Sequence, residues 1–155
     1  YFNTDIIGTQ LGGAIKNIIA IACGIVIGNQ LGENARSSVL TRGLQELIGL
    51  GLKMGAKRET FFGLSGLGDL NLSCCSTNSR NFCFGFKLGQ GISMVKLKNE
   101  KKLIEGVNSC DAVSELADRY QVDMPITHAV KKIMNGNSIK KVINILLSRP
   151  LQFES

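Results

Sequence analysis

The segment from residue 6 to residue 32 carries one charged side chain, Lys16, and this constrains the fold more than any other feature. Its uninterrupted apolar part, Ile18 to Gly28, is 11 residues long, short of the roughly 18 that a membrane-spanning helix needs. Aliphatic residues recur there at helical spacing, and small residues on the opposite side permit close backbone approach. The aliphatic stripe comprises Ile15, Ile18, Ile19, Ala22, Ile25 and Val26, and the small residues are Gly12, Gly13, Ala20, Cys23 and Gly24. We therefore expect a buried core helix and no membrane span.

The remaining sequence predicts further helices and no strand. An amphipathic run from Asn34 to Met54 has a broad apolar face, with Asn34 as its cap and Gly55 as its stop. The stretch 61–76 is rich in glycine and serine, which predicts a loop or a set of broken turns. More helices are expected at 79–88, from 109 or 111 to 120, at 124–135 and at about 138–147. The pattern is that of an all-α domain.

The length of the chain limits the number of domains, and its net charge indicates which kinds of partner it can bind. A chain of 155 residues suits a single domain whose core needs no disulfides. A net charge of +6 suits nucleic acid, an anionic membrane surface or small phosphorylated ligands. The basic residues are scattered, however, apart from Lys96, Lys98, Lys101 and Lys102, which we interpret as a solvated face. We therefore expect no nucleic-acid partner, while the apolar helices could bury a homodimer interface.

Cysteine and histidine usage argues against a disulfide framework and a metal site. The chain has five cysteines with no C-x-x-C pair, and its single histidine is His128. We interpret His128 as a structural or surface residue. A reduced, cytoplasmic protein without bound metal is the simpler expectation. The chain starts at Tyr1 with no signal-peptide pattern, so we expect a natural N-terminus elsewhere.

Lys16 is the strongest anomaly in the sequence. Its helical neighbours at three and four positions are Gly12, Gly13, Ile19 and Ala20, and none can pair with its charge. Burial of an unpaired ammonium is costly, so the group either extends to the surface or meets a partner from outside the helix. Burial would also make it exchange a proton more readily near neutral pH. The alternative is a surface lysine with Asp5 or Glu33 nearby in the fold.

Two further motifs suggest ligand contacts, although each has an ordinary structural explanation. In Gly63-Leu-Ser-Gly-Leu-Gly-Asp69, three glycines allow close backbone approach and Asp69 supplies a carboxylate; a tight turn explains the same pattern. In Ser79-Arg80-Asn81, a hydroxyl, a guanidinium and an amide meet at an expected helix start, which suits a phosphate group. An ordinary serine cap followed by a solvated arginine explains that motif equally well.

Five motifs occur together in one order, and their combination is more specific than any of them alone. They are Leu11-Gly-Gly-Ala-Ile-Lys-Asn17, Gly32-Glu-Asn-Ala-Arg36, Gly66-Leu-Gly-Asp-Leu70, Ser79-Arg-Asn81 and Glu105-Gly106. The chain thereby resembles the C-terminal, substrate-binding half of bacterial NAD(P)-dependent glycerol-3-phosphate dehydrogenases. Among its departures from the family pattern, Glu33 replaces the usual aspartate. The resemblance implies one helical domain, residues 1–155, of the 6-phosphogluconate dehydrogenase C-terminal-like type. In that family it follows a Rossmann domain, and these residues contain no strand followed by G-x-G-x-x-G.

The resemblance also implies roles for individual residues. Lys16 would be the general acid/base in the reduction of dihydroxyacetone phosphate by NADH or NADPH to sn-glycerol 3-phosphate, which supplies the glycerophospholipid backbone. Asp69 would help to hold the substrate and Lys16, and Ser79, Arg80 and Asn81 would bind the phosphoryl end. The cofactor, NAD or NADP, would contact Arg80, Leu103 and Glu105, with most of its site in the Rossmann domain. The isolated chain is then expected to be nearly inactive.

Two other functions fit parts of the pattern. The chain could be the helical domain of another dehydrogenase that acts on hydroxy acids, but a phosphate-free substrate leaves Ser79-Arg80-Asn81 without a purpose. It could instead be a non-catalytic helical module that binds phosphorylated metabolites. In that case replacing Lys16 in the full-length protein would leave turnover unchanged.

Overall fold

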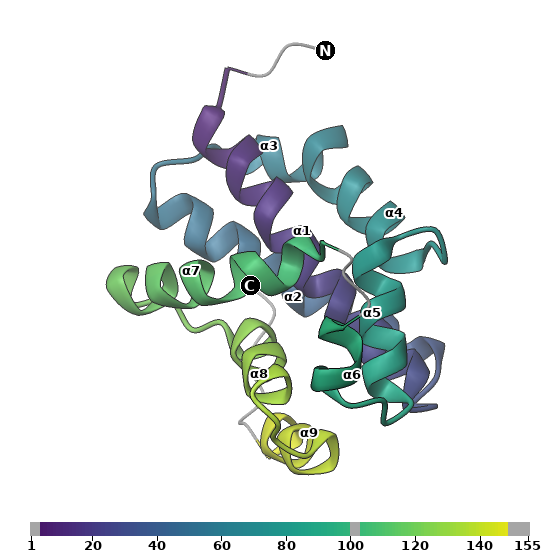
Figure 1. The fold of residues 1–155 in the computed structure, drawn as a ribbon. Helices are drawn as coiled ribbons and strands as arrows, with labels where there is room; N and C mark the ends of the chain where they lie inside the picture. Colours follow the sequence, from purple (N-terminus) through teal and green to yellow (C-terminus); the bar gives the residue numbers. More distant parts are fainter. Residues whose placement is uncertain (1–3, 100–102, 149–155) are drawn as a thin grey trace.

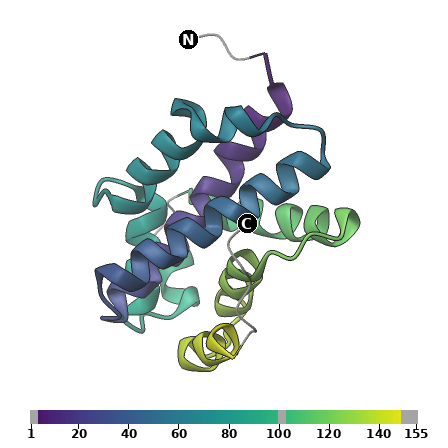
Figure 2. The same ribbon diagram turned by 180° about the vertical axis from the view of Figure 1, so that it is seen from behind.

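One long helix, α1, forms the axis of the domain. The structure is a computed structural model that describes residues 4–99 and 103–148. Helix α1 (Ile6–Gly28) contacts α2 (Glu33–Lys53), α4 (Asp69–Cys75), α5 (Arg80–Gly89), α7 (Glu105–Tyr120) and α8 (Pro125–Met134). Figures 1 and 2 show these helices arranged around it, with α9 (Ile139–Leu147) beyond α8. Within the described residues there is no strand, so the prediction of an all-α domain is confirmed.

Helix α1 is buried by the protein's own helices. By length and composition this 23-residue helix could cross a membrane, which the 11-residue apolar count had not suggested. However, 78% of its most apolar window is buried inside the domain. Ile15, Ile18 and Ile19 have no exposed surface, as expected of a core helix.

Paired glycines bring α1 and α5 into close, parallel contact. A Cβ atom added at Gly85 would lie 2.0 Å from the carbonyl oxygen of Ile21, and one at Gly24 would lie 2.1 Å from that of Phe82. One turn further along both helices, Gly89 faces Ile25 and Gly28 faces Phe86 in the same way. Glycine is required here because any side chain would push the backbones apart. One turn earlier, the same register places Asn17 opposite Asn81.

The stretch 61–76 is helical rather than a loop, which corrects the prediction. It contains the end of α3 (Arg58–Phe62), a π-helical turn, η1 (Leu64–Gly68), and α4. Gly66 allows the backbone to approach Phe61, whose carbonyl oxygen would lie 2.3 Å from an added Cβ. Gly66 thus serves close packing, and none of the glycines of this stretch has the positive φ that marks a glycine turn.

Other helix starts also differ from the predictions. Helix α7 begins at Glu105 rather than at residue 109 or 111, and α2 begins at Glu33 with Gly32, not Asn34, as its N-cap. The short helix α6 (Met94–Lys98) lies in the segment interpreted as a solvated basic face, and Lys101 and Lys102 are outside the described residues. The stops at Gly55 and Gly136 are confirmed, with φ near +90° at both.

Two buried carboxylates connect helices that are distant in sequence. Asp5 accepts hydrogen bonds from Gly8 N (2.9 Å), Lys57 N (2.8 Å) and the Thr60 hydroxyl (2.8 Å), which joins the start of α1 to α3. The backbone hydrogen bond from Gly8 is the main reason why the pKa of Asp5 lies below its ordinary value. Glu46 of α2 caps α8 in a similar way, and burial raises its pKa to about 7.

Candidate functional site

Lys16 is paired with a carboxylate from another helix. Its ammonium donates to Asp69, the first residue of α4, and the two side chains are 22% and 38% exposed. The charge that no neighbour on α1 could balance is therefore balanced by a residue 53 positions away. The carboxylates considered as surface partners have other contacts: Glu33 pairs with Arg36, and Asp5 caps α1.

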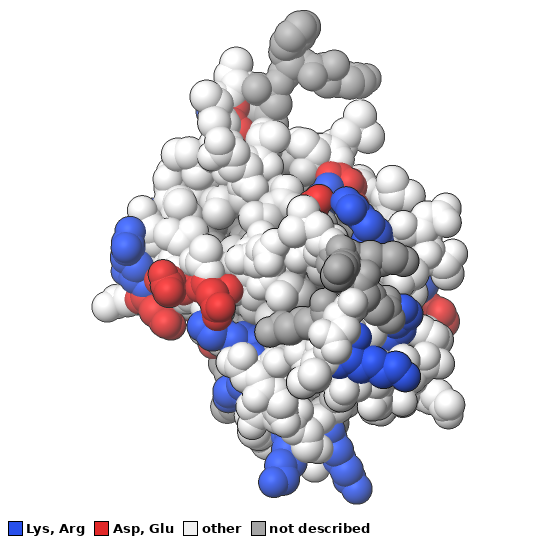
Figure 3. Space-filling model, viewed as in Figure 1, with Lys and Arg blue, Asp and Glu red and all other residues white. Residues whose placement is uncertain are grey.

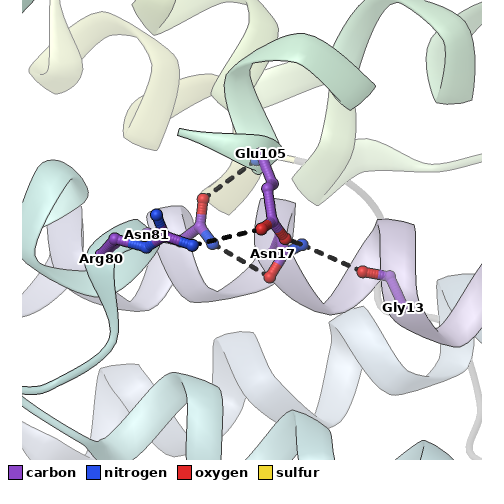
Figure 4. A network of polar contacts seen from close by, with 6 residues as sticks. Gly13, Asn17, Arg80, Asn81 and Glu105 are labelled. Atoms are coloured by element: carbon purple, nitrogen blue, oxygen red, sulfur yellow. Dashed lines mark hydrogen bonds and ion pairs between the residues drawn. The ribbon is translucent and has the colours of Figure 1, made fainter. Parts of the chain in front are cut away.

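Asn17, the next residue on α1, is the centre of a polar network that joins three helices (Figure 4). Its Nδ2 donates to Gly13 O (3.0 Å) and to Glu105 Oε2 (2.9 Å), and its Oδ1 accepts from Asn81 Nδ2 (3.0 Å). Asn17 is only 6% exposed, so these bonds satisfy an amide that water cannot reach. Asn17 was not among the predicted site residues. A buried polar position beside Lys16 was the available signal.

Asn81 fixes the start of α7 against α5. Its Oδ1 accepts from Gly106 N at 3.0 Å and so satisfies one of the free N–H groups of the first turn of α7. Gly106 is again a close approach, since an added Cβ would lie 2.8 Å from Asn17 O. This contact explains why α7 begins before any local capping residue.

Arg80 and Glu105 form the exposed edge of the network. Arg80 Nη2 lies 3.3 Å from Glu105 Oε1, and the side chains are 62% and 50% exposed. Ser79 caps α5 as predicted, because its hydroxyl oxygen accepts from Phe82 N at 3.3 Å. Its own O–H remains a potential donor beside the first turn of α5. Leu103, two residues before α7, is 62% exposed.

Six of the seven predicted residues thus gather beside the middle of α1, where α4, α5 and α7 begin. Lys16 and Asp69 form one pair; Arg80, Asn81 and Glu105 are connected through Asn17; and Ser79 adjoins Arg80. The seventh, Leu103, is an exposed residue two positions before Glu105. Figure 3 shows charged side chains of both signs next to each other beside α4, and acidic ones over α7. Cations, amides and a helix N-terminus in one place suit a small anionic ligand.

Comparison with known proteins identifies the family. The family described as NAD-dependent glycerol-3-phosphate dehydrogenase C-terminus matches residues 5–144. The chain belongs to this family. The resemblance inferred from the five motifs is therefore confirmed.

Similar proteins carry the same family name. The glycerol-3-phosphate dehydrogenase [NAD(P)+] of Rhodospirillum rubrum is 48% identical over 99% of this chain and 45% of its own length. That of Staphylococcus haemolyticus is 47% identical over 99% of this chain and 47% of its own length. The chain thus spans about half the length of the curated glycerol-3-phosphate dehydrogenases that it matches.

Solved structures of glycerol-3-phosphate dehydrogenases share the fold. The crystal structure of the Coxiella burnetii protein has a TM-score of 0.91 and 42% identity, covering 96% of this chain and 46% of that one. The structure of the Saccharomyces cerevisiae protein has a TM-score of 0.80 at 26% identity, over 92% of this chain and 42% of that one. In each case the match covers the half that corresponds to this helical domain.

Proposed function

We propose that residues 1–155 form the C-terminal, substrate-binding domain of an enzyme that interconverts dihydroxyacetone phosphate and sn-glycerol 3-phosphate with NAD(H) or NADP(H). The observation that carries this proposal is the Lys16–Asp69 pair beside the Arg80 network at the start of α5. It combines a proton donor with a site for a phosphoryl group. An enzyme of this kind would supply the glycerophospholipid backbone, and the free cysteines fit a reducing cytoplasm.

Lys16 is the general acid/base in this proposal. Its ammonium gives a proton to the carbonyl oxygen of dihydroxyacetone phosphate as the carbonyl carbon is reduced, and it takes the proton back in the reverse direction. Asp69 orients the ammonium through the ion pair between them. Positioned proton transfer of this type contributes about 10²–10⁴-fold to the rate.

The phosphoryl end of the substrate binds at the start of α5. Arg80 supplies a charged donor, the Ser79 hydroxyl has a free O–H, and the first turn of α5 provides backbone N–H groups. Asn81 is 8% exposed and already donates to Asn17, so it contributes its remaining N–H and otherwise holds the network together.

The exposed edge of the network has the chemistry to hold part of a dinucleotide. Glu105 offers a carboxylate for hydroxyl groups, Arg80 offers a guanidinium for phosphate, and exposed Leu103 offers an apolar surface. When bound, the nicotinamide group supplies or accepts the hydride. The rest of its site would belong to a preceding Rossmann domain, so we expect the isolated chain to be nearly inactive.

Replacement of Lys16 in the full-length protein tests the proposal. We expect Lys16→Ala to lower kcat for dihydroxyacetone phosphate by about 10²–10⁴-fold while the thermal unfolding temperature changes little. Lys141→Ala, which removes an exposed lysine from α9, is the control and should retain full activity. Unchanged turnover in Lys16→Ala would favour a non-catalytic module. Preference for an unphosphorylated substrate would favour another hydroxyacid dehydrogenase.

A further inference from the structure

The ion pair between Arg80 and Glu105 is weak enough for a ligand to separate it. The Nη2–Oε1 distance is 3.3 Å, and both side chains are at least half exposed. Exposed ion pairs of this kind contribute little to stability because water solvates both charges well. Arg80 can therefore exchange its carboxylate partner for another anion at small cost.

Glu105, in contrast, is held in place from the buried side. Its second oxygen, Oε2, accepts from Asn17 Nδ2 at 2.9 Å, and Asn17 is itself fixed by Gly13 and Asn81. Glu105 is also the first residue of α7, where the helix dipole favours a negative charge. When Arg80 turns to another anion, the carboxylate of Glu105 therefore remains close by.

Among the described residues of the site, the charged groups are paired with one another. Lys16 is paired with Asp69, and Arg80 is paired with Glu105, so these four groups sum to zero. A phosphoryl group brings a charge of about −1.5 to −2 near pH 7. It must compete with Glu105 for Arg80 and then remain beside the negative charge that it has displaced.

We propose that Glu105 sets the affinity of this site for phosphorylated ligands by competing with the phosphoryl group for Arg80. The inference rests on the proposed function and assigns Glu105 a role in addition to the cofactor contact. Glu105 acts through Arg80 and is thus a positioning residue with respect to the phosphoryl group. Its carboxylate weakens binding of free phosphate and of glycerol 3-phosphate by a similar factor. A phosphorylated ligand therefore needs its additional contact with Lys16 to bind well.

Calorimetric titration of the full-length protein with inorganic phosphate and with glycerol 3-phosphate tests the proposal. Glu105→Gln keeps the shape and an oxygen for Asn17 but removes the charge. We expect both ligands to bind about two- to fivefold more tightly, because Arg80 no longer has to leave an exposed carboxylate partner before it meets the phosphoryl group. Glu115→Gln, the same change at an exposed position of α7, is the matched control and should leave both affinities unchanged. Equal or weaker binding in Glu105→Gln would overturn the proposal.

A double-mutant cycle with Arg80→Ala shows whether the effect passes through Arg80. If Glu105 competes for the guanidinium, most of the gain from Glu105→Gln disappears when Arg80 is absent. A gain that persists in full would contradict the competition. Tighter binding is also an outcome that a damaged fold does not produce. Glu105→Asp, which keeps the charge, should show much less gain than Glu105→Gln, and an equal gain would likewise count against the proposal.

The outcomes separate this inference from the proposed function. If the wild-type protein binds neither phosphate nor glycerol 3-phosphate, the proposed function fails. If it binds both and Glu105→Gln brings no gain, only the role of Glu105 is wrong.

Discussion

Glu46 and Glu105 both lie beside the first turn of a helix, but their surroundings differ. Glu46 is 5% exposed, and its two oxygens accept from Ile126 N, from Thr127 N (3.1 Å) and from the Thr127 hydroxyl (3.0 Å). Glu105 is 50% exposed and has one buried and one exposed partner. Both oxygens of the first carboxylate accept hydrogen bonds from groups inside the fold. Glu105 and its partner Arg80 can still form hydrogen bonds with a ligand. This difference distinguishes the candidate site from a structural contact.

The largest expected effect on stability comes from Glu46. Glu46→Ala leaves three buried donors at the start of α8 without an acceptor, which we expect to lower the free energy of unfolding by about 3 kcal/mol. Chemical denaturation of the full-length protein measures this, with Glu115→Ala as an exposed control. Activity assayed well below the unfolding temperature should stay near wild type. A loss of activity without a loss of stability would contradict the structural role given to Glu46.

Arg80 should show the opposite behaviour. Arg80→Ala removes a charged donor from the exposed edge of the polar network. We therefore expect kcat/KM for dihydroxyacetone phosphate to fall about ten- to a hundredfold. At saturating cofactor the loss should be much smaller for unphosphorylated dihydroxyacetone, because that substrate has no group for Arg80 to bind. Chemical denaturation should detect little change, since the ion pair with Glu105 is exposed. Equal losses for both substrates would contradict the role given to Arg80.

The pH dependence of stability gives a smaller effect with a definite sign. Burial raises the pKa of Glu46 from 4.5 to about 7 in the folded protein. Between pH 4.5 and pH 7, the carboxyl group of Glu46 therefore binds its proton more tightly in the folded state than in the unfolded chain. The contribution of this group to stability is lost as pH rises from about 4.5 to about 7. Denaturation across this range should therefore show wild type losing stability relative to Glu46→Gln. A rise would mean that the hydrogen bonds outweigh burial.

Asp5 should behave in the opposite direction. Its pKa is lowered in the folded protein, mainly by the hydrogen bond from Gly8 N. Its contribution to stability is therefore present above the ordinary value of 3.8 and is lost as pH falls through the lowered pKa. Asp5→Asn should remove this acid-dependent part, which denaturation at low pH would detect.

The smallest effect is expected for an ion pair outside the site. Lys131 lies 3.0 Å from Asp111, whose side chain is 75% exposed. Because solvent screens such a pair, Asp111→Asn should change neither the unfolding temperature nor kcat/KM measurably. A clear loss of activity would show that exposure does not separate structural from functional contacts here.

The sequence predicted the helices better than the way they meet. The apolar stripe on α1 and the glycine stops after α2 and α8 are local signals, and the structure confirms them. The stretch 61–76 was misjudged because Gly66 permits close packing, which local spacing does not distinguish from a turn. The start of α7 depends on Asn81, 25 residues earlier, and therefore has no local signal.

The candidate site was predicted in part, mainly through the order of its motifs. The pattern around Lys16 indicated an unpaired charge but not its partner, because Asp69 comes from another helix. Asn17 is the last residue of the first of the five motifs. Its central position in the polar network, however, follows only from the register of α1 and α5. Glu46 has no sequence signal, since an isolated glutamate on a helix is ordinarily exposed.

A crystal structure of the full-length protein with sn-glycerol 3-phosphate would show whether Lys16 and the start of α5 bind one ligand. We expect the phosphoryl group within hydrogen-bonding distance of Ser79, Arg80 and Asn81, and the C2 oxygen within that distance of Lys16 Nζ. A ligand bound away from the start of α5, or one whose C2 oxygen is remote from Lys16, would contradict this expectation.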